Sequence, residues 1–208
     1  MASPVLKPTV KSETRIPLEF TEEEDNLRIT GFWMFLVTDI LIFASLFSVY
    51  AVYHFHTAGG PSPLQIFHLG PALTETLLLL TSSFTISLAI WSMRRGRVAD
   101  LYFWLALTMA LGAAFVGIEL HEFAGDIATG AGWSRSAFLS AFFVLVATHG
   151  THVTIGILWA IALLVQLLQR GLTSTTTRKL YTFALYWHFL DIIWVFIFTY
   201  VYLAGRLV

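Results

Sequence analysis

The sequence predicts an all-α membrane protein, built as a bundle of five transmembrane helices. Of its 208 residues, 57% are hydrophobic and only 12% are charged, whereas a soluble domain is about 45–50% apolar and about 25% charged. Five apolar stretches can each cross a bilayer core about 30 Å thick, because a helix rises about 1.5 Å per residue. The chain has no cysteine, which excludes disulfide scaffolds, iron–sulfur clusters and thiol catalysis. Its net charge of −1 lacks the basic excess of a nucleic-acid-binding protein.

The five expected spans follow one another with short connections. They cover residues 31–54, 71–93, 101–121, 137–168 and 180–204. The first connection is rich in Gly and Pro, and Pro71 suits the first turn of the second span. The second is the cationic segment Arg94–Arg97, and Gly171 is placed to end the fourth span. That fourth span has no charged residue over 32 positions, so its length of about 48 Å requires it to tilt or to protrude into water.

We divide the chain into a tail and a transmembrane domain. Residues 1–28 are polar, contain three prolines and carry the acidic run Glu22–Asp25, which we interpret as a mobile cytoplasmic tail. Residues 29–208 form the five-helix transmembrane domain. A signal peptide is not expected, because the first apolar stretch begins far along the chain and is too long for an h-region.

The positive charges predict the orientation of the bundle. Cytoplasmic loops of membrane proteins carry an excess of Lys and Arg. Ten of the 12 Lys and Arg residues fall on one side if the N-terminus is cytoplasmic. Five spans then place the C-terminus on the periplasmic side.

Seven ionisable residues lie within the apolar stretches: Asp39, Glu75, Glu119, His149, His152, His188 and Asp191. Each costs at least about 2.5–3.5 kcal/mol in the hydrocarbon layer, so each needs a partner or a purpose. We expect them to face the protein interior. Helix rise counted from the predicted cytoplasmic ends gives two layers. The outer layer holds Glu75, Glu119, His149 and His152, and the inner layer holds Asp39, His188 and Asp191.

Other interpretations of these groups stay open. His149 and His152 share one helix face at a spacing of three residues, and histidines beside carboxylates can bind iron, copper or zinc. We favour hydrogen bonding between helices, because the sequence contains no Glu-x-x-His motif. Glu75 and the hydroxyls along its helix would suit part of a proton relay, but also a structural role.

Four tryptophans are candidates for the lipid interface. Trp33 and Trp91 lie near span ends and suit an interfacial aromatic belt. Trp187 and Trp194 lie deeper, where either lipid-tail contact or packing inside the bundle would suit them.

The chain shows no catalytic machinery of its own. Only three histidines lie deep in the spans, too few for the haem and copper ligands of a respiratory catalytic core. No Walker loop, catalytic triad order or dinucleotide fingerprint occurs. We therefore expect no catalytic, cofactor-binding or metal-binding residue in this chain.

Several motifs resemble one known family. They are GFWMFLVTD (residues 31–39), TAGGP (57–61), ETLLLLTSS (75–83), SAFFVLVATHGTHVT (140–154), RGLTS (170–174) and YWHFLDIIW (186–194). Together they resemble subunit III of the haem–copper respiratory oxidases, and the similarity covers the chain from Gly31 onward. Within the family, the residues of these motifs are most similar to those of the five-helix subunit III of bacterial cytochrome bo-type ubiquinol oxidase.

The resemblance implies a non-catalytic subunit in the bacterial cytoplasmic (inner) membrane. Its partners would be subunit I, which would hold the haems and copper, subunit II, a small subunit IV and membrane lipids, with bound phospholipid. The complex would oxidise quinol, reduce oxygen to water and pump protons. The seven buried polar residues would then be structural, or would modulate proton uptake by subunit I.

Three alternatives to the quinol oxidase remain. Five-helix forms of subunit III also occur in some cytochrome c oxidases. An independent membrane ion transporter is less favoured, because transporters often contain inverted repeats and the sequence shows no repeat. A membrane metalloenzyme would depend on His149 and His152.

Overall fold

Five long helices make up the protein. The structure, a computed structural model, describes residues 23–54, 56 and 69–206. The helices are α1 (Glu23–Tyr53), α3 (Leu69–Arg94), α4 (Val98–Ala128), α5 (Ala137–Arg170) and α6 (Ser174–Ile197). A π-helix, Phe198–Leu203, and a short 3-10 helix, Ala204–Arg206, continue α6. The five helices are long and apolar enough to cross a membrane, and the described residues contain no strand, which confirms the predicted all-α class.

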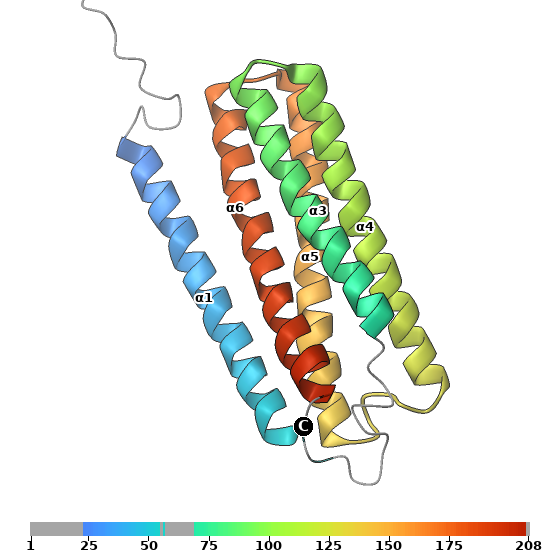
Figure 1. The fold of residues 1–208 in the computed structure, drawn as a ribbon. Coiled ribbons are helices and arrows are strands. Elements are labelled where there is room, and N and C mark those ends of the chain that lie inside the picture. Colours follow the sequence, from blue (N-terminus) through green and yellow to red (C-terminus); the bar gives the residue numbers. More distant parts are fainter. Residues whose placement is uncertain (1–22, 55, 57–68, 207–208) are drawn as a thin grey trace, which may run out of the picture.

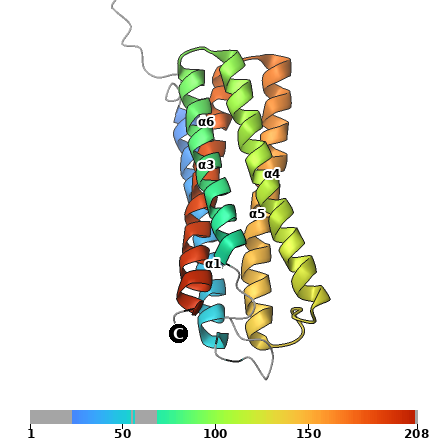
Figure 2. The same cartoon turned by 45° about the vertical axis from the view of Figure 1, so that its right-hand side comes forward.

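The helices stand side by side with their axes nearly aligned (Figure 1, Figure 2). α3 and α4 form the most extensive pair, and α6 packs against both α5 and α3. α1 lies at one edge of the bundle and contacts α5 and α6 (Figure 1). The start of α1, the α3–α4 connection and the α5–α6 connection lie at one end of the bundle, and the C-terminus lies at the other.

The helices extend beyond the predicted spans. α1 begins at Glu23, so residues 23–28 of the predicted tail are helical, and the mobility of the tail stays a prediction. The other residues of that predicted tail lie outside the described part of the chain. α4 continues to Ala128, well past the predicted end at residue 121. Hydropathy marks the apolar part of a helix, whereas its polar end turns continue into the interface.

Local sequence signals explain where the helices begin and end. The hydroxyl of Ser136 accepts a hydrogen bond from the Leu139 N–H and caps α5. Thr173 and Thr176 form a reciprocal capping box at the start of α6. Gly171 ends α5 as predicted, with a φ of 65° that a residue with a Cβ rarely adopts.

The centre of the bundle is aromatic. Trp187 and Trp194 of α6 are 2% and 0% exposed, so lipid contact is wrong for both and packing is correct. Each indole also joins α6 to α3, because Trp187 Nε1 donates to Ser82 Oγ (2.9 Å) and Trp194 Nε1 donates to Thr76 Oγ1 (3.1 Å). A buried indole N–H needs such an acceptor.

α1 is attached by one narrow stripe. Its buried residues are Leu36, Asp39, Phe43 and Tyr50, whose spacings of three, four and seven place them on one helical face. Most other large apolar residues of α1 are exposed, among them Met34, Val37 and Leu41, although Phe32, Leu46 and Phe47 pack partly against the core. This helix therefore has a large surface available for lipid or for another protein.

Candidate functional site

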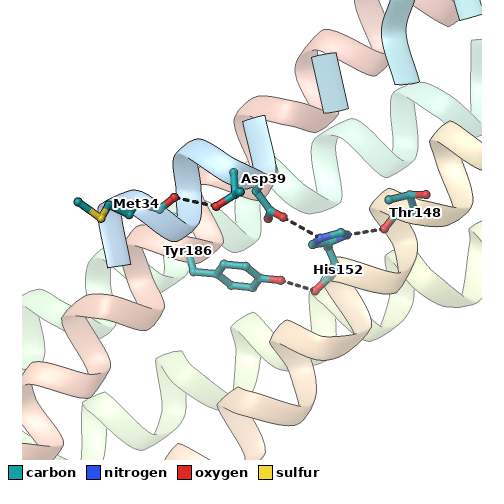
Figure 3. Close-up of polar contacts among 6 residues, drawn as sticks. Met34, Asp39, Thr148, His152 and Tyr186 are labelled. Carbon is teal, nitrogen blue, oxygen red and sulfur yellow. Dashed lines mark hydrogen bonds and ion pairs between the residues drawn. The ribbon is translucent and has the colours of Figure 1, made fainter. Parts of the chain in front are cut away.

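The contact between Asp39 and His152 joins α1 to α5 (Figure 3). His152 Nε2 lies 3.3 Å from Asp39 Oδ1, and its Nδ1 lies 2.7 Å from the carbonyl oxygen of Thr148. Tyr186 of α6 completes the arrangement, because its hydroxyl donates to the backbone carbonyl of His152 (3.0 Å). Three helices thus meet at one imidazole.

The partners of His152 fix how its protons are placed. The Thr148 carbonyl can only accept, so Nδ1 must carry a hydrogen. Nε2 is directed at the Asp39 carboxyl, so both ring nitrogens have polar partners. The side chains of His152 and Asp39 are 18% and 5% exposed, and buried polar groups need such partners.

Three buried ionisable residues lie in the centre of the bundle. Glu75, Glu119 and His149 are 1%, 4% and 0% exposed and come from α3, α4 and α5. Thr85 of α3 hydrogen-bonds Thr108 of α4 (2.8 Å). Counted from that contact along the two antiparallel helices, Glu75 and Glu119 lie about 15 Å and 16 Å away toward the same end.

Glu119 reaches across to α5. A Cβ placed on Gly150 would overlap the Glu119 carboxylate and lie 2.8 Å from its Cδ. The carboxylate therefore occupies the space that a side chain at position 150 would fill. Gly150 follows His149 directly, so the structure brings Glu75, Glu119 and His149 to the same level of the bundle.

Aromatic rings surround His149. The ring centroids of Phe115 and Trp194 lie 5.7 Å and 5.1 Å from its own, and that of Phe43 lies 6.3 Å away. Neither ring nitrogen has a hydrogen-bond partner among the described residues. His149 therefore packs as an aromatic ring between α1, α4 and α6.

A third polar group joins α6 to α3. His188 Nδ1 lies 2.6 Å from Ser83 Oγ, and its Nε2 lies 3.4 Å from Ser87 Oγ. Asp191 is one turn further along α6 and also interacts with Ser83. Among the described residues, no hydrogen bond or ion pair joins this group to the Asp39–His152 pair.

The predicted two-layer arrangement is wrong for Asp39. Asp39 contacts His152, which was placed in the outer layer, and not His188 or Asp191. The apolar span of α1 begins at Thr30, one residue from the predicted start. Helix rise counted from the span ends therefore does not give the level at which α1 lies beside α5.

The arrangement does not fit a metal centre. Among the described residues, no three His, Asp or Glu side chains gather so that they could hold an ion. Both nitrogens of His152 face other protein atoms, and His149 is enclosed by rings. Two histidines on one helix face do not converge on a common point here.

Sequence reasoning missed several residues that build these sites. Tyr186 supplies a hydroxyl, Ser83 a hydrogen-bond partner and Gly150 a space, and none of the three is charged at neutral pH. We selected candidates by the free-energy cost of placing a charged group in the membrane, and this criterion does not select uncharged residues. Two signals were available: the serine pair Ser83 and Ser87, and glycine inside an apolar helix.

The remaining predicted interface residues lie on the surface. Trp33 and Trp91 are 52% and 46% exposed, and Trp91 also lies beneath the guanidinium of Arg95, 3.8 Å from the ring centroid. A lipid-interface role for them stays a prediction.

Comparison with known proteins gives consistent matches over most of the chain. The family model for cytochrome c oxidase subunit III matches residues 12–206. Quinol oxidase subunit 3 of Bacillus subtilis (strain 168) is 49% identical over 189 residues, 91% of this chain and 93% of that protein. Cytochrome bo(3) ubiquinol oxidase subunit 3 of Pseudomonas aeruginosa is 50% identical over 86% of each. Cytochrome c oxidase subunit 3 of Bacillus sp. (strain PS3) is 43% identical over 88% of each.

Proposed function

This chain belongs to the cytochrome c oxidase subunit III family, and from that premise we propose that it is subunit III of a haem–copper quinol oxidase. Such a complex oxidises quinol, reduces oxygen to water and pumps protons. The chain's own part is accessory: it stabilises subunit I and supports proton uptake there. The complex lies in the bacterial inner membrane and also contains subunit II and a small subunit IV.

The names of the relatives support quinol as the electron donor. The relatives named as quinol or ubiquinol oxidase subunits are 43–50% identical. A relative named as a cytochrome c oxidase subunit is 43% identical, which makes cytochrome c oxidase the second candidate. The relatives above 45% identity that are named here are all quinol or ubiquinol oxidase subunits, and this observation carries the choice of donor.

The geometry of the polar groups supports an accessory role. Asp39, Glu119 and His188 each contact a different helix from their own, as groups that hold helices together would. The donor set does not fit haem or copper, because His149 is enclosed by rings and His152 has both nitrogens engaged. The haems and copper therefore belong to subunit I in this proposal.

An apolar groove supports the proposed bound phospholipid. It lies between α1 and α5, is open to the outside, and is lined by side chains that include Leu46, Val49 and Val144. Its lining is almost wholly hydrocarbon, which suits an acyl chain.

The test of this function is purification with the chain's natural partners. A tag on the C-terminus would allow the complex to be isolated in mild detergent from bacterial membranes. We expect haem, copper and oxygen consumption driven by ubiquinol but not by reduced cytochrome c. Oxygen consumption driven by cytochrome c would favour the second candidate, and a chain that purifies without haem-bearing partners would contradict both.

A further inference from the structure

The face shared by α3 and α6 carries a polar group that points away from the core. Ser83 and His188 are half-buried and Ser87 is exposed, and both nitrogens of His188 are directed at the two hydroxyls. Asp191 beside them is 9% exposed, and its Oδ1 has no hydrogen-bond partner among the described residues. The group thus combines an imidazole, two hydroxyls and a carboxyl with unused hydrogen-bonding capacity.

This polar group lies near the middle of the membrane. α3 ends at Arg94, in the cationic connection, and Ser83 is 11 residues before it. At about 1.5 Å per residue this is about 16 Å, close to half of a 30 Å hydrocarbon core. Acyl chains at that depth offer no hydrogen bonds, so polar side chains there usually face protein or a water-filled cavity.

Thr38, Ser45 and Thr151 on the outer surface each donate to a carbonyl four residues back in their own helix, and Ser87 does the same, which satisfies these hydroxyls locally. The α3–α6 face differs because its two serine hydroxyls also contact a half-buried imidazole, that of His188. The rest of the outer surfaces of α1 and α5 is mainly apolar, with exposed Leu41, Ile155 and Leu158. The α3–α6 face is therefore the one that lipid covers least well at mid-depth.

The same face allows a close approach by another helix. Ser83 and Ser87 are small residues four apart on α3, the spacing at which transmembrane helices pack closely. Phe84, 63% exposed, and Ile192, 55% exposed, flank them on α3 and α6. Small polar residues between large apolar ones are the composition of a helix–helix interface in a membrane.

We propose that this face, formed by Ser83, Ser87, His188 and Asp191, docks a transmembrane helix of a neighbouring oxidase subunit that presents a hydrogen-bonding side chain to the exposed Ser87 and the half-buried His188. The proposal rests on the proposed function, because it requires a partner subunit in the membrane. It adds which face of this chain the partner covers and what chemistry the partner brings.

Site-specific photo-crosslinking in intact membranes tests this docking face. A benzophenone amino acid at Phe84 is compared with the same residue at Leu158, which is 62% exposed on α5. The two positions match in depth. Trp187 bonds to Ser82 of α3 and lies against Gly156 of α5, so these two residues are at the same level. Phe84 and Leu158 each lie two residues after them, toward the same end of the bundle.

We expect Phe84 to give a protein adduct with a haem-bearing or other oxidase subunit, in a yield about tenfold above that of Leu158. Adducts with lipid only, or with a second copy of this chain, would overturn the proposal, as would an equal or higher yield of subunit adduct at Leu158. The same preparation is checked for co-purified haem. Absent haem would count against the proposed function, whereas haem with adducts only from Leu158 would overturn the docking face alone.

A substitution pair gives an independent measurement. Ser87→Trp places a bulky side chain on the proposed face, and Thr154→Trp does the same on α5, where Thr154 is exposed and bonds to its own helix as Ser87 does. We expect the Ser87 variant to dissociate from the complex about tenfold more readily in detergent, equivalent to about 1.4 kcal/mol, with the Thr154 variant unchanged. Equal dissociation of both variants would contradict the proposal.

Discussion

At the scale of single residues, ionisable side chains buried within the bundle connect one helix to another. Asp39 and His152 meet between α1 and α5, where His152 Nε2 lies 3.3 Å from Asp39 Oδ1. Glu119 fills the space left by Gly150 on the neighbouring helix. In each case a residue of one helix depends on a particular residue of another, and this dependence can be measured.

The Asp39–His152 pair is tested by a double-mutant cycle. Asp39→Leu and His152→Leu each leave one buried polar partner unsatisfied, whereas the double variant leaves neither. We expect each single variant to lower the free energy of unfolding, and the double variant to lose about 1 kcal/mol less than the sum. The measurement is equilibrium unfolding in a detergent titration. Additive losses would show that the two side chains do not depend on each other.

Gly150 offers a sharper test with a matched control. A Cβ at position 150 overlaps the Glu119 carboxylate, whereas a Cβ at Gly117 on α4 meets nothing within 4 Å. Gly150→Ala should therefore cost about 1–3 kcal/mol of stability through overpacking. Gly117→Ala should be neutral or stabilising, because alanine favours the helix by about 1 kcal/mol. Thermal unfolding of the two variants compares them directly, and equal midpoints would contradict the position assigned to Glu119.

At the scale of elements, Trp187 determines how closely α4, α5 and α6 approach. Cβ atoms on Gly112 of α4 and Gly156 of α5 would come within 2.8 Å and 2.9 Å of its indole ring. The indole ring therefore fits between α4 and α5 only because both helices have a glycine, which has no Cβ, at the point of contact. Its N–H then fixes the register with α3 through Ser82.

This arrangement predicts compensation between two substitutions. Gly156→Ala should destabilise the bundle by about 1–3 kcal/mol, because the new methyl meets the indole. Trp187→Phe should also destabilise it, through a cavity and the lost bond to Ser82. The double variant should be more stable than the sum of the single effects predicts, because the smaller ring makes room for the methyl. A double variant at or below that sum would contradict the close packing.

The sequence predicted the elements better than their contacts. Hydropathy and length identified all five helices, and Gly171 marked the end of α5 correctly. The start of α1 was placed too late because Glu23–Arg28 is polar, and counting helix rise from the span ends did not give the level at which Asp39 contacts His152. The inward position of Trp187 and Trp194 could not be predicted, since an apolar ring in a membrane suits both lipid and the core.

At the scale of the whole molecule, most of the positive charges lie at one end of the bundle. The α3–α4 and α5–α6 connections, with Arg94, Arg95, Arg97, Arg170, Arg178 and Lys179, lie at the same end of the bundle as the start of α1 (Figure 1). Because cytoplasmic loops carry the excess of Lys and Arg, this end should face the cytoplasm. The orientation stays a prediction.

The lack of cysteine makes the orientation simple to measure. Thr129→Cys, after α4, and Thr175→Cys, at the start of α6, are exposed positions at opposite ends of the bundle. A membrane-impermeant thiol reagent should label Cys at position 129 from the periplasmic side and should label position 175 only in inverted vesicles. The reverse pattern would mean that the bundle has the opposite orientation.

The central claim is that this chain braces a companion subunit and carries out no chemistry itself. The most direct measurement compares the purified oxidase with and without this chain, recording haem content and the rate of quinol oxidation per haem over successive turnovers. We predict the same initial rate per haem in both preparations, followed by faster loss of activity or of partner subunits where the chain is missing. Immediate loss of quinol oxidation with the haem content unchanged would contradict the claim.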